Sequence, residues 1–119
     1  MKAEEIRNMN ANTEMDALIA RNIIGLEESH ESGWWWVNGM MDECPDYSDN
    51  ISDAWKVVEK LNSMGAWVSL SKGADNFTWD FRGIINEGKK NEVRFINHAE
   101  TAPLAICRAA LLAVMEFEE

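Results

Sequence analysis

Two stretches in the first half of the chain repeat apolar residues at helical spacing. The first spans residues 13–24, where Thr13 is a suitable N-cap and Gly25 a suitable C-terminal stop. The second begins at Ser48 or Asp49, either of which can cap a helix. Its apolar residues fall on one helical face: Ile51, Ala54, Trp55, Val58 and Leu61. We therefore expect two amphipathic helices, each packed on a core through one side.

After residue 65 the apolar pattern changes to the period of strands. The clearest alternation sets Phe77, Trp79 and Phe81 against Thr78, Asp80 and Arg82. Residues 67–70 and residues 92–97 also have the pattern of short strands. The connections between the three, around residues 71–75 and 86–88, are short turns. This spacing predicts an antiparallel meander of three strands.

A third helix is expected from Thr101 to about Phe117, with Pro103 in its first turn. It is apolar nearly all round, which predicts burial against the sheet or at a subunit interface. Between the first two helices, residues 26–48 form a long connection in which residues 34–38 have the pattern of one short strand. The three consecutive tryptophans in it cannot all face one side, so we expect at least one to be exposed or covered by a partner.

Together these elements predict a single α/β domain of the α+β kind, with about three helices and a small antiparallel meander. The domain covers residues 13–119, and residues 1–12 are expected to be a flexible lead-in that is frayed or forms a short helix. Because 46% of the residues are hydrophobic, the chain can build its core without metal ions or disulfides.

Charge and cysteine content narrow the classes of partner. The chain has 21 acidic and 11 basic residues and a formal net charge of −10, which argues against direct nucleic-acid binding. The acidic surface serves solubility or imitates DNA, and both uses stay open. No stretch approaches the ~20 apolar residues of a membrane span, and the charged residues 1–7 do not resemble a secretory signal. We expect Cys44 and Cys107 to be reduced thiols of a cytosolic protein, and a single disulfide between them stays open as the alternative.

The sequence contains no recognisable catalytic or metal-binding motif. Neither His30 nor His98 has a second histidine or a cysteine at ligand spacing. Cys107 lies within an apolar helix, where a thiol is normally inert. There is no nucleophile elbow, zinc-protease motif or phosphate-binding glycine loop. We therefore expect a non-enzymatic protein without a metal or cofactor, while a two-carboxylate site assembled only by the fold stays open.

Arg108 is the most informative charged residue because it stands inside the apolar last helix. A buried guanidinium must meet an anion or several carbonyls, so Arg108 is either a structural contact or an anchor for a phosphate or carboxylate. Arg82 and Arg94, on neighbouring predicted strands, would add positive charge if they lie nearby. The aromatic stripe of the middle strand is typical of a core, although its last member, Phe81, can also emerge at a sheet rim and stack on a base.

Three segments carry a family resemblance: DALIARNIIG at residues 16–25, YSDNISDAWKVVEKL at residues 47–61 and TAPLAICRAALL at residues 101–112. They resemble the small phage proteins grouped as the phage ABA (α-β-α) sandwich domain family. The resemblance spans most of the chain from residue 13 to residue 115, and its last segment is the most specific. It implies a three-layer α-β-α sandwich, a phage origin and a place in the host bacterial cytoplasm, but for most members no function.

A narrower resemblance is to the Thoeris anti-defence sponges of phages, which sequester cyclic ADP-ribose isomers and, in some members, cyclic oligonucleotides. It implies that Phe81 stacks on adenine, that Arg108 pairs with the pyrophosphate and that Asn91 hydrogen-bonds the base or ribose. With Arg82 and Arg94 these residues form the expected ligand-binding set. The run Trp34–Trp36 has no counterpart in that pattern. We expect a homo-oligomer that captures a small nucleotide-derived immune signal without breaking a bond.

Two other classes of function stay open from the sequence. One is a protein-binding inhibitor of a host defence nuclease, of the anti-CRISPR or DNA-mimic kind, which would need carboxylates spaced like phosphates. The sequence scatters its carboxylates instead. The other is an enzyme, which turnover of a cyclic nucleotide would reveal.

Overall fold

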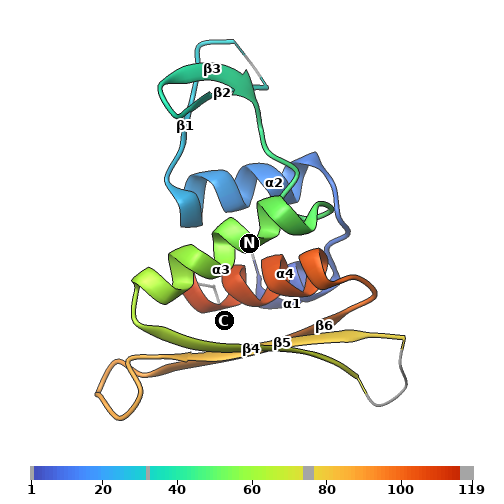
Figure 1. The fold of residues 1–119 in the computed structure, drawn as a ribbon, viewed down its shortest axis with the longest axis vertical. Coiled ribbons are helices and arrows are strands. Elements are labelled where there is room, and N and C mark those ends of the chain that lie inside the picture. The colour runs from blue at the N-terminus through green and yellow to red at the C-terminus, as the bar shows by residue number, and fades with distance from the viewer. Residues whose placement is uncertain (1, 32, 74–76, 116–119) are drawn as a thin grey trace.

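The computed structural model describes residues 2–31, 33–73 and 77–115, which form an α+β fold. Two small antiparallel sheets lie toward opposite ends of the long axis, with the helices between them (Figure 1). Within these residue ranges, no helix is long and apolar enough to cross a membrane.

The larger sheet is the antiparallel meander that the alternation predicts. Its strands, in spatial order, are β4 Ala66–Lys72, β5 Trp79–Ile85 and β6 Val93–Ala99. The register sets Leu70 opposite Phe81, and Phe81 opposite Asn97. Alternate residues of β5 and β6 face the helices, so the rings of Phe81 and Phe95 are buried with their centres 6.2 Å apart.

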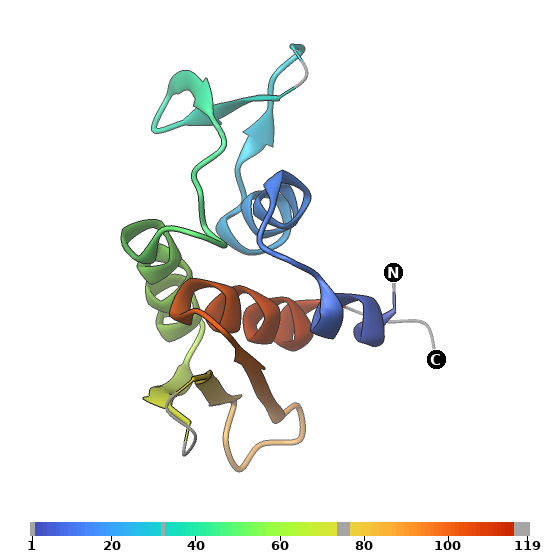
Figure 2. The same ribbon diagram turned by 90° about the vertical axis from the view of Figure 1, so that its right-hand side faces the viewer.

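Two long helices cover the inner face of this meander (Figures 1 and 2). They are α3 Ile51–Ser63 and α4 Ala102–Val114, which also contact each other. Thr101 caps α4, since its hydroxyl accepts the backbone N–H of Leu104 at 3.3 Å. The predicted burial of this helix is confirmed, because every residue from Pro103 to Leu111 except Arg108 is buried. The helix ends at Val114, and Phe117, the expected end, lies outside the described residues.

The N-caps of the first two predicted helices lie one or two residues away from the expected positions. Asn12, not Thr13, caps the first helix, and Asn50, not Ser48 or Asp49, caps α3. In each case the amide oxygen accepts the backbone N–H three residues further on, at 2.9 and 3.0 Å respectively. The two predictions of cap position are therefore wrong in detail, although the helices begin where the pattern indicates.

The first predicted helix changes its hydrogen bonding midway. It consists of α2 Thr13–Ile19 and a π-helical turn, η1 Ala20–Ile24. Gly25, with a φ of +85°, ends it as predicted. The segment 1–12, expected as a lead-in, contains the short helix α1 Ala3–Asn8, which contacts α4 and buries Ile6 completely.

The described residues between 26 and 48 form three strands where the sequence predicts one. They form the smaller sheet, with β1 Glu27–Glu28, β2 Trp34–Val37 and β3 Met40–Glu43 in that order. Trp35 is 2% exposed, whereas Trp34 and Trp36 are 40% and 45% exposed. The expectation that the three tryptophans face different ways is confirmed, and Trp35 is the one that joins this sheet to the core.

Candidate functional site

The outer face of the β4–β6 meander is covered by no helix among the described residues (Figures 1 and 2). Alternation along the three strands places two cross-strand rows on this face: Trp67, Ile84 and Arg94, followed by Ser69, Arg82 and Ile96. Residues 66–99 also contain five of the 11 basic residues but only four of the 21 acidic ones. This end of the molecule is therefore weakly positive in a strongly acidic chain.

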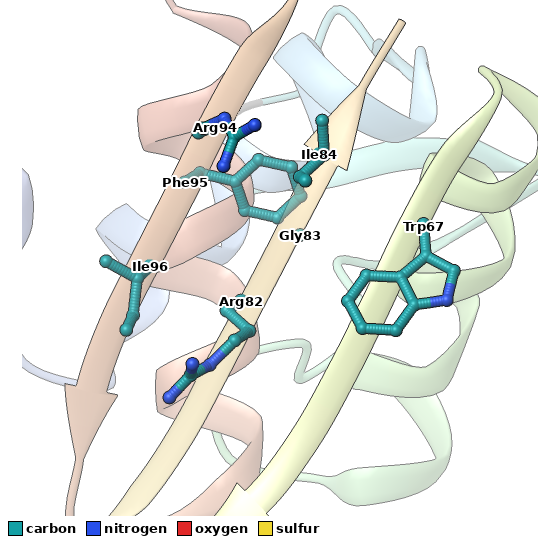
Figure 3. A pocket seen from close by; sticks show the side chains of 7 residues that line it. All are labelled: Trp67, Arg82, Gly83, Ile84, Arg94, Phe95 and Ile96. Atoms are coloured by element: carbon teal, nitrogen blue, oxygen red, sulfur yellow. The ribbon is translucent and has the colours of Figure 1, made fainter. Parts of the chain in front are cut away.

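A shallow pocket of about 270 Å³ lies on this outer face (Figure 3). It is lined by Trp67, Arg82, Gly83, Ile84, Arg94, Phe95 and Ile96. Figure 3 shows Trp67, Arg82 and Arg94 projecting from three adjacent strands around Gly83 and Ile84. The Trp67 side chain is 61% exposed, so its indole is open to a ligand. The pocket combines an apolar floor and an aromatic wall with two guanidinium groups.

Gly83 allows the close packing beneath this pocket. A Cβ atom at position 83 would lie 2.5 Å from Cζ of Phe95 and 2.6 Å from the backbone oxygen of Trp67, closer than atoms can approach. Gly83 and Phe95 are directly opposite in the β5–β6 register. The absence of a side chain at Gly83 therefore lets the Phe95 ring lie against β5. The floor of the pocket depends on this contact.

The two arginines of the pocket differ in their partners. Nε of Arg94 donates to Oε2 of Glu92 at 3.0 Å, and this hydrogen bond raises the pKa of Arg94. The backbone N–H of Gly88 donates to Oε1 of Glu92 at 3.0 Å, and both hydrogen bonds lower the pKa of that carboxyl. Among the described residues, no hydrogen-bond or ion-pair partner contacts the side chain of Arg82. Its guanidinium is therefore available to an external anion without breaking an internal pair.

At the end of the outer face away from Arg94, an imidazole–carboxylate pair places a negative charge. His98 and Asp80 are directly opposite in the β5–β6 register, and Nδ1 of His98 contacts Oδ1 of Asp80. Asp80 lies two residues before Arg82 on the same face of β5. An anion is therefore favoured at the Arg82 and Arg94 end of the face rather than here.

Arg108 belongs to α4, which packs on the inner face of the meander (Figure 1), whereas Arg82 and Arg94 lie on the outer face. Its Nε donates to the backbone oxygen of Met9 at 2.8 Å, and its Nη1 donates to that of His98 at 3.2 Å. Burial lowers the pKa of the guanidinium, and Glu100 acts in the opposite direction. Arg108 thus ties the N-terminal segment to β6, and it also borders a separate pocket of about 170 Å³.

The structure does not bring the five expected ligand residues together. Arg82 and Arg94 share the outer face, Asn91 is exposed in the β5–β6 hairpin, and Arg108 is on α4. Phe81 is 1% exposed and packs in the core, so its ring is not open for stacking on a base.

The outer face offers Trp67 as its exposed aromatic residue, and the sequence analysis did not select it. The signal was present in the strand pattern of residues 67–70. Val68 and Leu70 pack against the core, which turns Trp67 to the opposite face.

The two thiols are poor nucleophiles in this structure. Burial raises the pKa of the Cys44 thiol to about 11, with nearby carboxylates acting in the same direction. Burial in α4 raises the pKa of Cys107 still further. In the part of the chain that the structure describes, no three His, Cys, Asp or Glu side chains are grouped to hold a metal ion.

Comparison with known proteins assigns the chain to a family. Residues 17–111, which include the meander and most of the helices, match the phage ABA sandwich domain. The structure is similar to the crystal structure of a phage protein from Bacillus cereus ATCC 14579, with a TM-score of 0.71 and 31% sequence identity over 90% of this chain and 95% of that chain. No curated protein matches the chain. This chain therefore belongs to the phage ABA sandwich domain family.

Proposed function

We propose that this phage protein captures a cyclic nucleotide signal of host immunity on the outer face of β4–β6 and does not break it down. The observation that carries the proposal is the pair of arginines beside an apolar pocket with an exposed indole, in a chain of net charge −10. The ligand would be a cyclic ADP-ribose isomer or a cyclic oligonucleotide.

The chemistry of this face suits both parts of such a ligand. A guanidinium matches the geometry of a phosphate with two parallel hydrogen bonds, and Arg82 has no internal partner to release. The indole of Trp67 can stack on a base, a contact that contributes ~1–3 kcal/mol in other proteins. Phe81 supports this face from beneath instead of stacking on the ligand itself. Asn91 reaches solvent from the hairpin and stays available as a hydrogen-bonding group.

The size of the pocket supports a homo-oligomer. Its volume of about 270 Å³ lies below the range of ~300–1,000 Å³ that is usual for drug-sized ligands. A second copy placed over the exposed Trp67 and Ile96 would enlarge the pocket and exclude water from the arginine–phosphate contacts. Capture then requires tight stoichiometric binding, not turnover.

Isothermal titration calorimetry with cyclic ADP-ribose and with cyclic di-AMP tests the proposal. Loss of a hydrogen bond to a charged group predicts that Arg82→Ala weakens binding by at least ~10-fold. Arg94→Ala should weaken it less, because Glu92 already engages that guanidinium. Arg7→Ala, at an exposed arginine on α1, is the matched control and should bind as the wild type does. Ligand recovered after denaturation should be chemically intact by chromatography.

Each other outcome has a defined meaning. Failure of both probes to bind the wild type contradicts nucleotide capture. If Arg108→Ala abolishes binding while Arg82→Ala and Arg94→Ala do not, the ligand occupies the pocket beside α4 and the outer-face site is wrong. Conversion of either probe by the purified protein overturns the non-enzymatic part of the proposal.

A further inference from the structure

The β1–β3 sheet lies at the end of the molecule opposite the meander (Figure 1), and this end is strongly acidic. Residues 13–50, which form α2, η1 and the β1–β3 sheet, contain nine carboxylates and one arginine, and so account for −8 of the net charge of −10. We call this region the acidic end. Its charge is opposite in sign to that of the proposed nucleotide site, so it would take a different kind of partner.

A pocket of about 670 Å³ lies within the acidic end, between α2 and the β1–β3 sheet. Two tryptophans and four carboxylates line it: Trp34, Trp35, Glu14, Glu28, Glu43 and Asp46. None of the described residues that line it is basic. Indole rings and carboxylates together are the surroundings that favour an organic cation.

One indole–carboxylate pair of this sheet already holds a cation from the chain itself. Glu28 is directly opposite Trp35 in the β1–β2 register. The guanidinium carbon of Arg21 lies 5.5 Å from the centre of the Trp35 ring, and Nη2 of Arg21 lies 4.0 Å from Oε1 of Glu28. Trp35 and Glu28 therefore form a guanidinium site that Arg21 fills.

Trp34 and Glu43 form a second pair of the same kind. They are directly opposite in the β2–β3 register, and both line the pocket. Within residues 2–31, 33–73 and 77–115, no lysine or arginine pairs with Glu43 or lies over the ring of Trp34. The register also sets Glu27 opposite Trp36 and Asp42 opposite Trp35, but neither Glu27, Trp36 nor Asp42 lines the pocket. Of the two indole–carboxylate pairs that do line it, Arg21 fills one, and the pair of Trp34 and Glu43 is open to solvent.

We infer that Trp34 and Glu43 bind the side chain of an arginine that a partner protein presents, so that the acidic end is a docking surface for a basic segment. Arginine fits because its planar guanidinium stacks on an indole while it pairs with a carboxylate, as Arg21 does on Trp35. The net charge of −8 attracts and orients such a segment before contact.

The apolar surface beside this pair indicates a protein segment and not a free small cation. Trp36 lies on the same face of β2 as Trp34, and Met41 is its direct partner on β3. Both side chains are as exposed as Trp34. Apolar residues on either side of an arginine in a peptide would cover them, whereas a free cation would leave them in water.

Nuclear magnetic resonance of the ¹⁵N-labelled full chain tests this inference. The probe is the blocked tripeptide acetyl-Leu-Arg-Leu-amide, followed through the indole N–H signals of Trp34 and Trp35. The comparison probes are acetyl-Leu-Gln-Leu-amide and methylguanidinium. We expect saturable shifts with the arginine peptide, none with the glutamine peptide, and at least ~fivefold weaker binding of methylguanidinium because it lacks the apolar contacts. Added NaCl should weaken binding of the arginine peptide.

Variants assign the binding to the pair. Trp34→Ala and Glu43→Gln should each weaken peptide binding by about two- to fivefold, the range for a cation–π contact or an exposed ion pair. Both residues are exposed, so both variants should keep the dispersed spectrum of the folded chain. Trp55→Ala and Glu59→Gln change an exposed tryptophan and an exposed glutamate of α3, and they should leave peptide binding unchanged.

Three results would overturn the inference. The first is unchanged peptide binding in both Trp34→Ala and Glu43→Gln. The second is equal binding of methylguanidinium and the peptide, which would make the occupant a free cation. The third is self-association of the wild type that Trp34→Ala abolishes, seen by analytical ultracentrifugation, which would make the occupant a second copy of this chain.

Discussion

Asp16 is buried, with 5% of its surface exposed. Among the described residues, no other Asp, Glu, His, Lys or Arg is buried. Its Oδ1 accepts the backbone N–H of Ser48 at 2.8 Å and the hydroxyl of Ser48 at 2.7 Å, which joins α2 to the segment before α3. Burial raises the pKa of this carboxyl above its ordinary value of 3.8, against the two hydrogen bonds, and Asp46 and Asp49 act in the same direction as burial.

Replacing this carboxyl predicts a pH-dependent change in stability. Because folded Asp16 keeps its proton to a higher pH than unfolded Asp16, its contribution to stability is full below pH 3.8 and is lost as the pH rises through the folded pKa. Asp16→Asn keeps an acceptor for both Ser48 donors and does not titrate. The variant should therefore gain stability relative to the wild type as the pH rises from about 4 to 7.

Urea unfolding of both proteins at several pH values measures this difference. Carboxyl groups that the two proteins share cancel in the comparison, so the trend reports Asp16. A difference in unfolding free energy that stays constant across the range, or that moves in favour of the wild type with rising pH, would contradict the prediction.

Hydrogen bonding of single side chains was the least predictable feature from the sequence. Several residues near each helix start can act as caps, and Asn12 and Asn50 serve where Thr13 and Ser48 are equally suitable by type. Ser48 instead bonds a residue 32 positions away. Periodicity fixes where a helix begins to within a turn, but the choice among neighbouring caps depends on tertiary contacts.

At the scale of elements, the meander and the two long helices were predictable and the β1–β3 sheet was not. The former have apolar residues at regular spacing, which reports burial on one side. β1 has two residues, both glutamates, and every residue of β3 is exposed. The sequences of these two strands therefore show no alternation of buried and exposed residues. They are identified as strands only by their pairing with β2 in the structure.

The attachment of this small sheet to the rest of the molecule should depend on Trp35. It is the one residue of β1–β3 that is buried, and it also carries the contact with Arg21. Truncation of a buried tryptophan removes ~3–5 kcal/mol of packing. Trp35→Ala should therefore release the sheet and abolish amide protection in β2 and β3, while amides of β5 stay protected.

Hydrogen exchange of the wild type and of two variants measures this effect. Trp36→Ala removes a neighbouring tryptophan of the same strand that is 45% exposed, and it should change stability by no more than ~0.5 kcal/mol. Equal loss of protection in β2 for both variants would show that burial of Trp35 is not what holds the sheet.

At the scale of the whole molecule, the chain separates its charge between two ends. The acidic end carries −8, whereas residues 66–99 carry +1 when counted from five basic and four acidic residues. The composition shows only that the protein is acidic. The strand register of the structure shows that Arg82 and Arg94 lie on the same outward face. The position of Arg108 was not predictable, because its partner carbonyl at Met9 lies 99 residues earlier in the chain.

This separation predicts where repulsion between like charges acts on stability. Carboxylates crowded into residues 13–50 repel one another in the folded state, and salt screens exposed charges over a Debye length of ~10 Å at 0.1 M. Raising NaCl from 0.05 to 0.5 M should therefore raise the Tm of the wild type by ~3–6 °C, corresponding to ~1 kcal/mol. A variant that neutralises Glu27, Glu31 and Asp42 should lose most of this response, whereas one that neutralises Glu4, Glu59 and Glu87 should keep it.

All six residues are exposed, so the two triple variants differ in where they remove charge and not in how much. Equal salt responses of the two variants, measured by thermal unfolding at a fixed pH, would mean that total charge, and not its concentration at the acidic end, governs the effect.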